Sequence, residues 1–301
     1  MAVARGLMMA VFTSLKEDFT VNFDAINAYA QYVLKSGYKS VLVGGTTGEH
    51  MTLNLADRKK SIDLWLAAMK PAGIHVMVQV GGAPIPDVQE LAKYCQSIGV
   101  DSLLTMPELY FKPKNADELV NYVGLVAKAA PKLPIFYYHN PGRSNVQINA
   151  PEFMVKATAR IPNFKGMKYS PSDMSEAAQV LRVLKEGQEV YVSDDTQLAP
   201  AALLGVKSFM CTSFSLFPKL AQDIIAAVEA KDIDKARALQ ETLSLAIEAH
   251  LTEGEWVPSL KAGMEIVTDI KVGPPSPVLQ PISVEAKKRI EAKLKALKLV
   301  K

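Results

Sequence analysis

The sequence predicts an α/β protein: a closed (β/α)8 TIM barrel followed by a C-terminal helical extension. Three observations indicate this fold. Short apolar runs alternate with longer segments of helical periodicity, and the alternation occurs eight times. The predicted strands are apolar almost throughout, as in parallel sheets that are covered on both faces. The first strand is not followed by the Gly-x-Gly-x-x-Gly loop that would favour an open, doubly wound sheet.

The elements follow one another along the chain with recognisable start and stop signals. Gly37 and Gly99 end two of the helices, and Pro151 stands in the first turn of another. Asp173 followed by Glu176 is a predicted capping box. The predicted strands are residues 6–13, 40–43, 75–80, 102–105, 135–138, 166–168, 189–193 and 208–212. The predicted helices are residues 23–35, 55–69, 88–98, 116–130, 151–160, 173–185, 197–204 and 218–230.

Helical periodicity continues beyond the eighth unit. Residues 233–250, 257–267 and 284–299 each have a helical pattern, and the Gly-Pro-Pro-Ser-Pro sequence at 273–277 breaks it. We therefore assign residues 1–230 to a barrel catalytic domain. Residues 231–301 are assigned to a helical extension that packs on the barrel.

Composition and charge exclude several classes of function. The 34 basic and 31 acidic residues are spread along the chain, so no nucleic-acid partner is expected. Cys95 and Cys211 have no spacing that suits a disulfide framework or a metal site, and they are typical of a reducing compartment. No signal peptide and no membrane-spanning run are evident. A cytoplasmic protein without a membrane partner is expected.

Lys168 and Tyr138 are the candidate reactive residues. Each ends a predicted strand, and active sites of such barrels lie at the C-terminal ends of the strands. Desolvation lowers the pKa of a lysine from its ordinary value of roughly 10.4, and the neutral amine can attack a ketone. The tyrosine phenol could transfer protons beside it. The alternative is a strand-end lysine with its charged head in water and a tyrosine of the core.

The loop at residues 44–49 is a candidate anion site at the same mouth. It has three glycines, which let backbone amides approach a ligand, and the adjacent hydroxyls of Thr46 and Thr47. This composition suits a small carboxylate. An ordinary tight turn between a strand and a helix is the alternative interpretation.

Three motifs in order give the sequence a family resemblance. Residues 45–49 (Gly-Thr-Thr-Gly-Glu), 138–141 (Tyr-His-Asn-Pro) and 166–168 (Gly-Met-Lys) resemble the dihydrodipicolinate synthase and N-acetylneuraminate lyase family of class I, pyruvate-dependent aldolases. The resemblance covers nearly the whole chain. Within the family, the sequence Leu-Tyr-Phe-Lys-Pro at 109–113 and the Tyr-Tyr-His form of the tyrosine motif are similar to the animal N-acetylneuraminate lyases.

The resemblance implies a role for each matching residue. Lys168 would form a Schiff base with the 2-keto carbon, and Tyr138 would relay protons. Thr46 and Thr47 would hold the substrate carboxylate, with Thr47 also linked to Tyr138 and to an aromatic residue of a neighbouring subunit. Tyr110 is the candidate for that aromatic residue, although Phe111 could take its place. The resemblance implies a homotetramer and requires neither a metal nor an organic cofactor.

The predicted substrate-binding residues are only partly those of the sialic acid lyases. In those enzymes the loop after the seventh strand binds the glycerol-like tail of the sugar with a glycine, an aspartate and a glutamate, and a serine follows the eighth strand. Thr196 stands here in place of the glutamate, which removes an acceptor for two hydroxyls. The predicted set is Ser170, Ser193, Asp195, Thr196 and Thr212.

Arg143 is a further departure from the lyase pattern. An arginine five residues after the tyrosine resembles the dihydrodipicolinate synthases, where it meets the carboxylate of the second substrate. A surface arginine on a loop is the alternative.

The predicted function is therefore a Schiff-base aldolase that cleaves N-acetylneuraminate, or a similar 2-keto acid sugar, to pyruvate and an aldehyde such as N-acetylmannosamine. One alternative is a related synthase that joins pyruvate to a smaller or carboxylated aldehyde. Another is a protein that binds a keto acid or sugar without turnover. The sequence leaves the physiological aldehyde and the favoured direction open.

Overall fold

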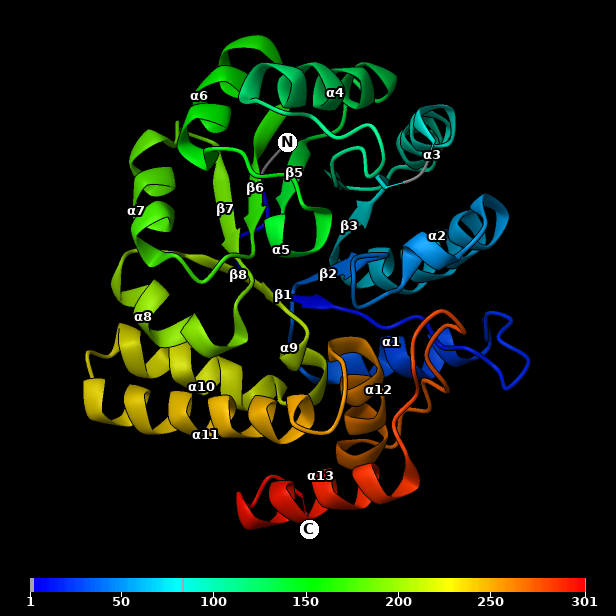
Figure 1. Cartoon of the computed structure of the whole chain (residues 1–301), viewed down its shortest axis with the longest axis vertical. Helices are drawn as coiled ribbons and strands as arrows, with labels where there is room; N and C mark the ends of the chain where they lie inside the picture. Colours follow the sequence, from blue (N-terminus) through cyan, green and yellow to red (C-terminus); the bar gives the residue numbers. More distant parts are fainter. Residues whose placement is uncertain (1–2, 83, 301) are drawn as a thin grey trace.

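The computed structural model describes residues 3–82 and 84–300. Its eight strands are all parallel and close into a barrel, in which each strand pairs with the next and β8 pairs with β1. The predicted fold class is thus confirmed (Figure 1). The strands are β1 Gly6–Ala10, β2 Ser40–Val43, β3 His75–Gln79, β4 Ser102–Thr105, β5 Ile135–His139, β6 Phe164–Tyr169, β7 Glu189–Val192 and β8 Ser208–Cys211.

Helices surround the barrel, and each predicted helix has a counterpart in the structure. Two short helices that the sequence analysis missed, α5 and α9, directly follow β5 and β8 at the mouth of the barrel. The helices are α1 Ala25–Lys35, α2 Leu55–Met69, α3 Ile85–Ile98, α4 Ala116–Ala129, α5 Pro141–Ser144, α6 Ala150–Arg160, α7 Met174–Val183, α8 Leu198–Leu203, α9 Ser213–Leu216, α10 Pro218–Glu229, α11 Ile233–Leu251, α12 Trp256–Val267 and α13 Val284–Ala296.

Side-chain caps fix where several helices begin. The side chains of Asn54, Asn115 and Asn149 each accept a hydrogen bond from the backbone N–H three residues later. Asp173 caps α7 in the same way. The reciprocal half of the predicted capping box is wrong, because Glu176 instead accepts hydrogen bonds from the Tyr169 hydroxyl and the Ala150 N–H.

The barrel separates the core into two parts. Residues that alternate along the strands point outward and pack against the helices, and the others fill the interior. Tyr138 belongs to the inner set, whereas its neighbours Tyr137 and His139 point outward. The inner cluster consists of Met8, Ala10, Leu42, Met77, Leu104, Phe136, Tyr138, Tyr191 and Met210.

The C-terminal helices lie against one side of the barrel, with α11 running along α10 and α12 packed against α9 (Figure 1). A buried ion pair links them to the mouth: Lys261 Nζ of α12 lies 2.6 Å from Glu49 Oε1 in the loop after β2. The division at residue 230 stays a prediction. Within the described residues, no helix is long and apolar enough to span a membrane.

Candidate active site

The two candidate reactive residues lie side by side inside the mouth of the barrel. Tyr138 of β5 and Lys168 of β6 are directly opposite each other in the strand register. The Lys168 ammonium lies 4.0 Å from the centre of the Tyr138 ring. Both side chains are buried. The structure therefore brings together the amine and the phenol that the sequence analysis singled out.

An irregularity between β5 and β6 sets this register. Ile135 pairs with Phe164, but the next residue, Phe136, pairs with Gly166, so that Lys165 is skipped. The extra residue is a β-bulge, and it changes which face of the strand the following side chains occupy. Because Gly166 then pairs with the inward-pointing Phe136, Lys168 pairs with the inward-pointing Tyr138.

Gly166 is required at the bulge for two reasons. Its φ of +135° lies in a region that residues with a side chain rarely adopt. A Cβ atom at this position would lie 1.8 Å from the carbonyl oxygen of Glu189 on the neighbouring strand. The glycine two residues before the lysine thus permits the backbone course that turns Lys168 inward.

The two threonines after β2 have different partners. Thr46 Oγ1 shares a hydrogen bond of 3.1 Å with the Tyr138 hydroxyl, to which Asn140 Nδ2 also donates at 3.3 Å. Thr47 Oγ1 instead shares a hydrogen bond of 2.8 Å with Thr212 Oγ1. The expected link between Thr47 and Tyr138 is therefore wrong, because adjacent residues of this tight loop turn toward β5 and β8 respectively.

The same loop is held in a strained but well-anchored conformation. Gly44 has a φ of +79°, and a Cβ atom there would lie 1.8 Å from the Nδ1 atom of the buried His50 ring. Glu49 also has a positive φ, of 51°, and its carboxylate is fixed by Lys261 and by the Ser276 N–H. In the described part of the chain, the backbone N–H groups of Thr46 and Thr47 donate to no protein acceptor. They are available to an anion.

The charge of Lys168 changes the acidity of the phenol beside it. Burial has the largest single effect and raises the pKa of Tyr138, but the Lys168 ammonium and the hydrogen bonds from Lys168, Thr46 and Asn140 together outweigh it. The pKa of Tyr138 is lowered to about 8. The phenol is thus poised to give or take a proton near neutral pH.

The ends of β6, β7 and β8 supply a hydroxyl-rich wall. Ser170 Oγ and Ser193 Oγ share a hydrogen bond of 2.6 Å, and both line the cavity around Lys168 together with Thr212. Asp195 also reaches this cavity, but its Oδ1 atom accepts the Ser213 N–H at 2.9 Å. Burial raises the pKa of Asp195 to about 6, while hydrogen bonds from Ser213 oppose the shift.

Thr196 is the one predicted substrate-binding residue that the structure places off the cavity wall. Its hydroxyl and its N–H both donate to Asp194 Oδ1, at 2.8 and 3.0 Å. Thr196 is the second residue of a short 3-10 turn, Asp195–Gln197, whose N-cap residue, Asp194, accepts from the Thr196 N–H. The structure therefore does not bring Thr196 to the cavity wall, and its direct contact with a substrate stays a prediction.

Arg143 lines the cavity at the mouth of the barrel, whereas Tyr110 lies outside it. Arg143 is an exposed residue of α5, and it lines both the cavity around Lys168 and a neighbouring one. Tyr110 and Phe111 lie in the loop after β4, with 83% of each side chain exposed and their rings 5.0 Å apart. They do not line the cavity of their own chain among the residues described.

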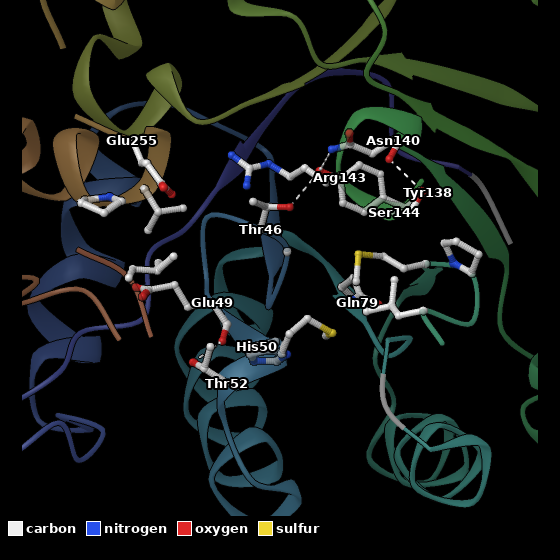
Figure 2. Close-up of a pocket in the computed structure, with 18 residues that line it drawn as sticks. Thr46, Glu49, His50, Thr52, Gln79, Tyr138, Asn140, Arg143, Ser144 and Glu255 are labelled. Atoms are coloured by element: carbon white, nitrogen blue, oxygen red, sulfur yellow. Dashed lines mark hydrogen bonds between the residues drawn. The ribbon is translucent and has the colours of Figure 1, made fainter. Parts of the chain in front are cut away.

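Two adjoining cavities open at this mouth. The one around Lys168 has a volume of about 270 Å³, and the other, of about 210 Å³, is mostly apolar. Figure 2 shows the second cavity, with Tyr138 and Asn140 on one side and Glu49 and His50 on the other. Both are lined by Thr46, Tyr138, Asn140 and Arg143.

Sequence reasoning missed several residues of this site. Asn140 contacts the Tyr138 hydroxyl, and its place directly before a proline in the family motif could have pointed to it. Trp256, from the predicted extension, lines the cavity and donates its indole N–H to Thr212 Oγ1 at 3.2 Å. Asp194 and Ser172 also line it. No local signal indicated Trp256, which lies 88 residues beyond Lys168 in the chain.

The geometry suits carbonyl chemistry. No carboxylate in residues 3–82 or 84–300 forms an ion pair with Lys168. The amino group is therefore not occupied by a fixed anion. A phenol of lowered pKa adjoins it, and open N–H groups for a carboxylate lie on the same rim. An amine that attacks a ketone, with an acid–base group beside it, is the arrangement of covalent catalysis through a Schiff base.

Comparison with known proteins identifies relatives over almost the whole chain. The Dihydrodipicolinate synthetase family matches residues 3–297. The N-acetylneuraminate lyase of Pongo abelii is 32% identical over 295 residues, which cover 97% of this chain and 92% of the relative. The N-acetylneuraminate lyase of Danio rerio is 33% identical over 291 residues, covering 96% and 95%.

A solved structure agrees with these sequence matches. The N-acetylneuraminate lyase (sialic acid aldolase) of Aliivibrio salmonicida superimposes with a TM-score of 0.94 and 29% identity, covering 100% of this chain and 99% of that one. Sequence and structure therefore point to the same group of relatives.

Proposed function

Because the chain belongs to the Dihydrodipicolinate synthetase family, we propose that it is a carbon–carbon lyase that cleaves N-acetylneuraminate to pyruvate and N-acetylmannosamine. The observation that carries the proposal is the pairing of Lys168 with Tyr138 across β5 and β6. The names of the relatives supply the substrate. A protein that only bound a keto acid would need neither the free amine nor the phenol of lowered pKa.

The first step is the formation of a Schiff base. The Lys168 amine attacks the 2-keto carbon, and the Tyr138 phenol protonates the departing hydroxyl. Loss of water leaves an iminium ion joined to the protein and a phenolate at Tyr138. The open N–H groups of Thr46 and Thr47, together with the Thr47 hydroxyl, hold the substrate carboxylate during this step. The positive iminium then withdraws electrons from the bond that breaks.

Tyr138 carries the proton in the second step. Its phenolate accepts the proton of the C4 hydroxyl, the C3–C4 bond breaks, and the electron pair moves to the iminium to give an enamine and a free aldehyde. The phenol returns its proton to C3 of the enamine. Water then hydrolyses the resulting iminium and releases pyruvate. Thr46 and Asn140 position the phenol through their hydrogen bonds to its oxygen.

Borohydride trapping tests the reaction class directly. Pyruvate and borohydride are added to the protein, and the intact mass and the modified peptide are measured. We expect one pyruvyl adduct on Lys168 and none on Lys261, the other buried lysine of the site region. Release of pyruvate from N-acetylneuraminate then identifies the substrate. Failure to form any adduct would favour a binding protein without turnover.

One observation favours a second candidate substrate. The exposed guanidinium of Arg143 lies at the rim shared by both cavities, where it could pair with a carboxylate (Figure 2). An aldehyde that carries a carboxylate, or a smaller aldehyde, would then be joined to or released from pyruvate. Product analysis over a panel of aldehydes, with Arg143→Ala as the matched variant, separates the two candidates.

The proposal includes a homotetrameric assembly and a cytoplasmic location. The exposed aromatic pair Tyr110 and Phe111 is suited to a subunit interface, and we propose a homotetramer in which Tyr110 reaches a neighbouring site. The free, buried thiols of Cys95 and Cys211 are consistent with a cytoplasmic location. Light scattering of the wild type and of Tyr110→Ala measures the assembly.

A further inference from the structure

The cavity around Lys168 contains a carboxylate that the proposed reaction does not use. Asp194 follows directly after β7 and lines the cavity wall together with Ser170, Ser172 and Ser193. In the proposed reaction the keto acid part of the substrate binds at the other end of the cavity, where Lys168 and the loop at residues 44–49 lie. The aldehyde half of a substrate bound to Lys168 must therefore extend along the remaining wall.

The three consecutive polar residues after Ser193 have different surroundings. Asp195 is buried, with 2% of its surface exposed, and it connects the loop to α9 through the Ser213 N–H. Its backbone oxygen also accepts Gln240 Nε2 of α11 at 3.1 Å. Thr196 lies off the wall and donates to Asp194. Asp194 is half-buried at the wall, and Thr196 and Ser172 donate hydrogen bonds to its carboxylate.

The hydrogen bonds of Asp194 leave it an unused acceptor position. Its Oδ1 atom accepts from the N–H and the hydroxyl of Thr196, and its Oδ2 atom accepts from Ser172 Oγ at 2.6 Å. A carboxylate offers about four lone-pair directions, so one remains on Oδ2. Ser172 is itself exposed and can rotate to donate to another group.

We propose that Asp194 is the specificity-determining residue that accepts hydroxyl groups of the aldehyde tail, and that Thr196 is the positioning residue that orients it. This inference rests on the proposed function and names the tail chemistry that the site selects: a polyhydroxylated aldehyde. The threonine that stands where a glutamate was expected thus acts through the carboxylate two residues before it. A tail bearing a second carboxylate would be repelled by Asp194.

Two substrates separate a role in tail recognition from a structural one. N-acetylneuraminate carries the hydroxylated tail, whereas 4-hydroxy-2-oxopentanoate has the same keto acid and C4 hydroxyl with only a methyl group beyond. In Asp194→Asn the amide oxygen still accepts from Thr196, but the NH2 group now faces Ser172 and the substrate. We expect the KM for N-acetylneuraminate to rise about ten- to a hundredfold with little change in kcat. The KM for 4-hydroxy-2-oxopentanoate should stay within about twofold.

Thr196→Val tests the positioning role, because it removes one donor to Asp194 and leaves the N–H. We expect a smaller rise in the KM for N-acetylneuraminate. The double variant should be no worse than Asp194→Asn alone, since both changes act on one carboxylate. Asp234→Asn, at an exposed carboxylate of α11, is the matched control and should leave both KM values unchanged.

The outcomes distinguish this inference from the proposed function. Equal changes for the two substrates, or no change for either, would overturn the role of Asp194 while leaving the lyase intact. If wild-type protein cleaves neither substrate and forms no pyruvyl adduct, the proposed function and this inference both fail. Trapping of pyruvate on Lys168 in Asp194→Asn verifies that the variant retains its folded reactive site.

Discussion

Lys168 and Lys261 are both buried lysines at the mouth of the barrel, with 6% and 1% of their surface exposed. Lys261 has two fixed partners: Glu49 Oε1 at 2.6 Å and the Pro274 carbonyl oxygen at 2.8 Å. Lys168 faces the Tyr138 ring and a cavity instead. Burial alone therefore does not make a lysine available to a substrate, because the Glu49 carboxylate and the Pro274 carbonyl oxygen hold the Lys261 ammonium in place.

The two lysines also act on different parts of the molecule. The ion pair of Lys261 joins α12 to the loop that carries Thr46 and Thr47, so it stabilises the position of this loop. Lys168 acts on the chemistry, since its ammonium lowers the pKa of Tyr138. We therefore expect that substitutions at the two lysines separate activity from stability.

The largest effect is expected from Lys168→Met. Turnover and the trapped pyruvyl adduct should both disappear, because no other amine reaches the 2-keto carbon. The free energy of unfolding should change by less than about 1 kcal/mol, since no carboxylate loses a partner. Pyruvate release and thermal unfolding are the measurements. Activity in this variant would contradict the mechanism.

Lys261→Met should instead lower the free energy of unfolding. It leaves the buried Glu49 carboxylate without its cation, which costs about 3 to 5 kcal/mol. Denaturant titration measures the loss. The double variant Lys261→Met/Glu49→Gln should recover most of it, because the uncompensated charge is gone and the amide still accepts from the Ser276 N–H. Equal stability of the single and double variants would show that the buried charge is not the cause.

The pH dependence of the reaction should depend on the Lys168–Tyr138 pair and not on Lys261. In the proposed mechanism the phenolate of Tyr138 is the proton acceptor, and the pKa of Tyr138 is about 8. Below that value the phenolate fraction falls tenfold with each pH unit, so kcat/KM for cleavage should fall in proportion. The profile should be unchanged in Lys261→Met protein kept folded at low temperature. A flat profile from about pH 6 to about pH 8 would argue against Tyr138 as the base.

The smallest effect concerns Asp195, a buried carboxylate that forms no ion pair with a lysine of residues 3–82 and 84–300. Burial raises its pKa to about 6 in the folded protein, above the ordinary value of about 3.9 for an aspartate. The folded state therefore binds more protons than the unfolded state between these values. Wild-type stability should fall, on the order of 1 to 3 kcal/mol, as the pH rises from about 4 to about 6. Asp195→Asn should remove this slope, as followed by thermal unfolding across the range, and Asp234→Asn should retain it.

Much of the fold follows from local patterns. Apolar runs, glycine stops and asparagine or aspartate caps are properties of neighbouring residues, and they located all eight strands to within a few residues. The strand ends were less accurate. The first strand stops at Ala10 rather than Thr13, since the chain leaves the barrel for an excursion in which Leu15 pairs with Val21.

The sequence by itself determined the barrel, the candidate pair Lys168 and Tyr138, and the candidate anion loop at residues 44–49, because strand order in a barrel brings all strand ends to one mouth. Only the tertiary structure decided that the bulge at Lys165 turns Lys168 inward, that Thr46 rather than Thr47 contacts Tyr138, and that Asp194 rather than Thr196 lines the cavity. These facts depend on register and on side-chain direction between residues far apart in the chain. A one-residue shift reverses the face of a strand without changing its composition.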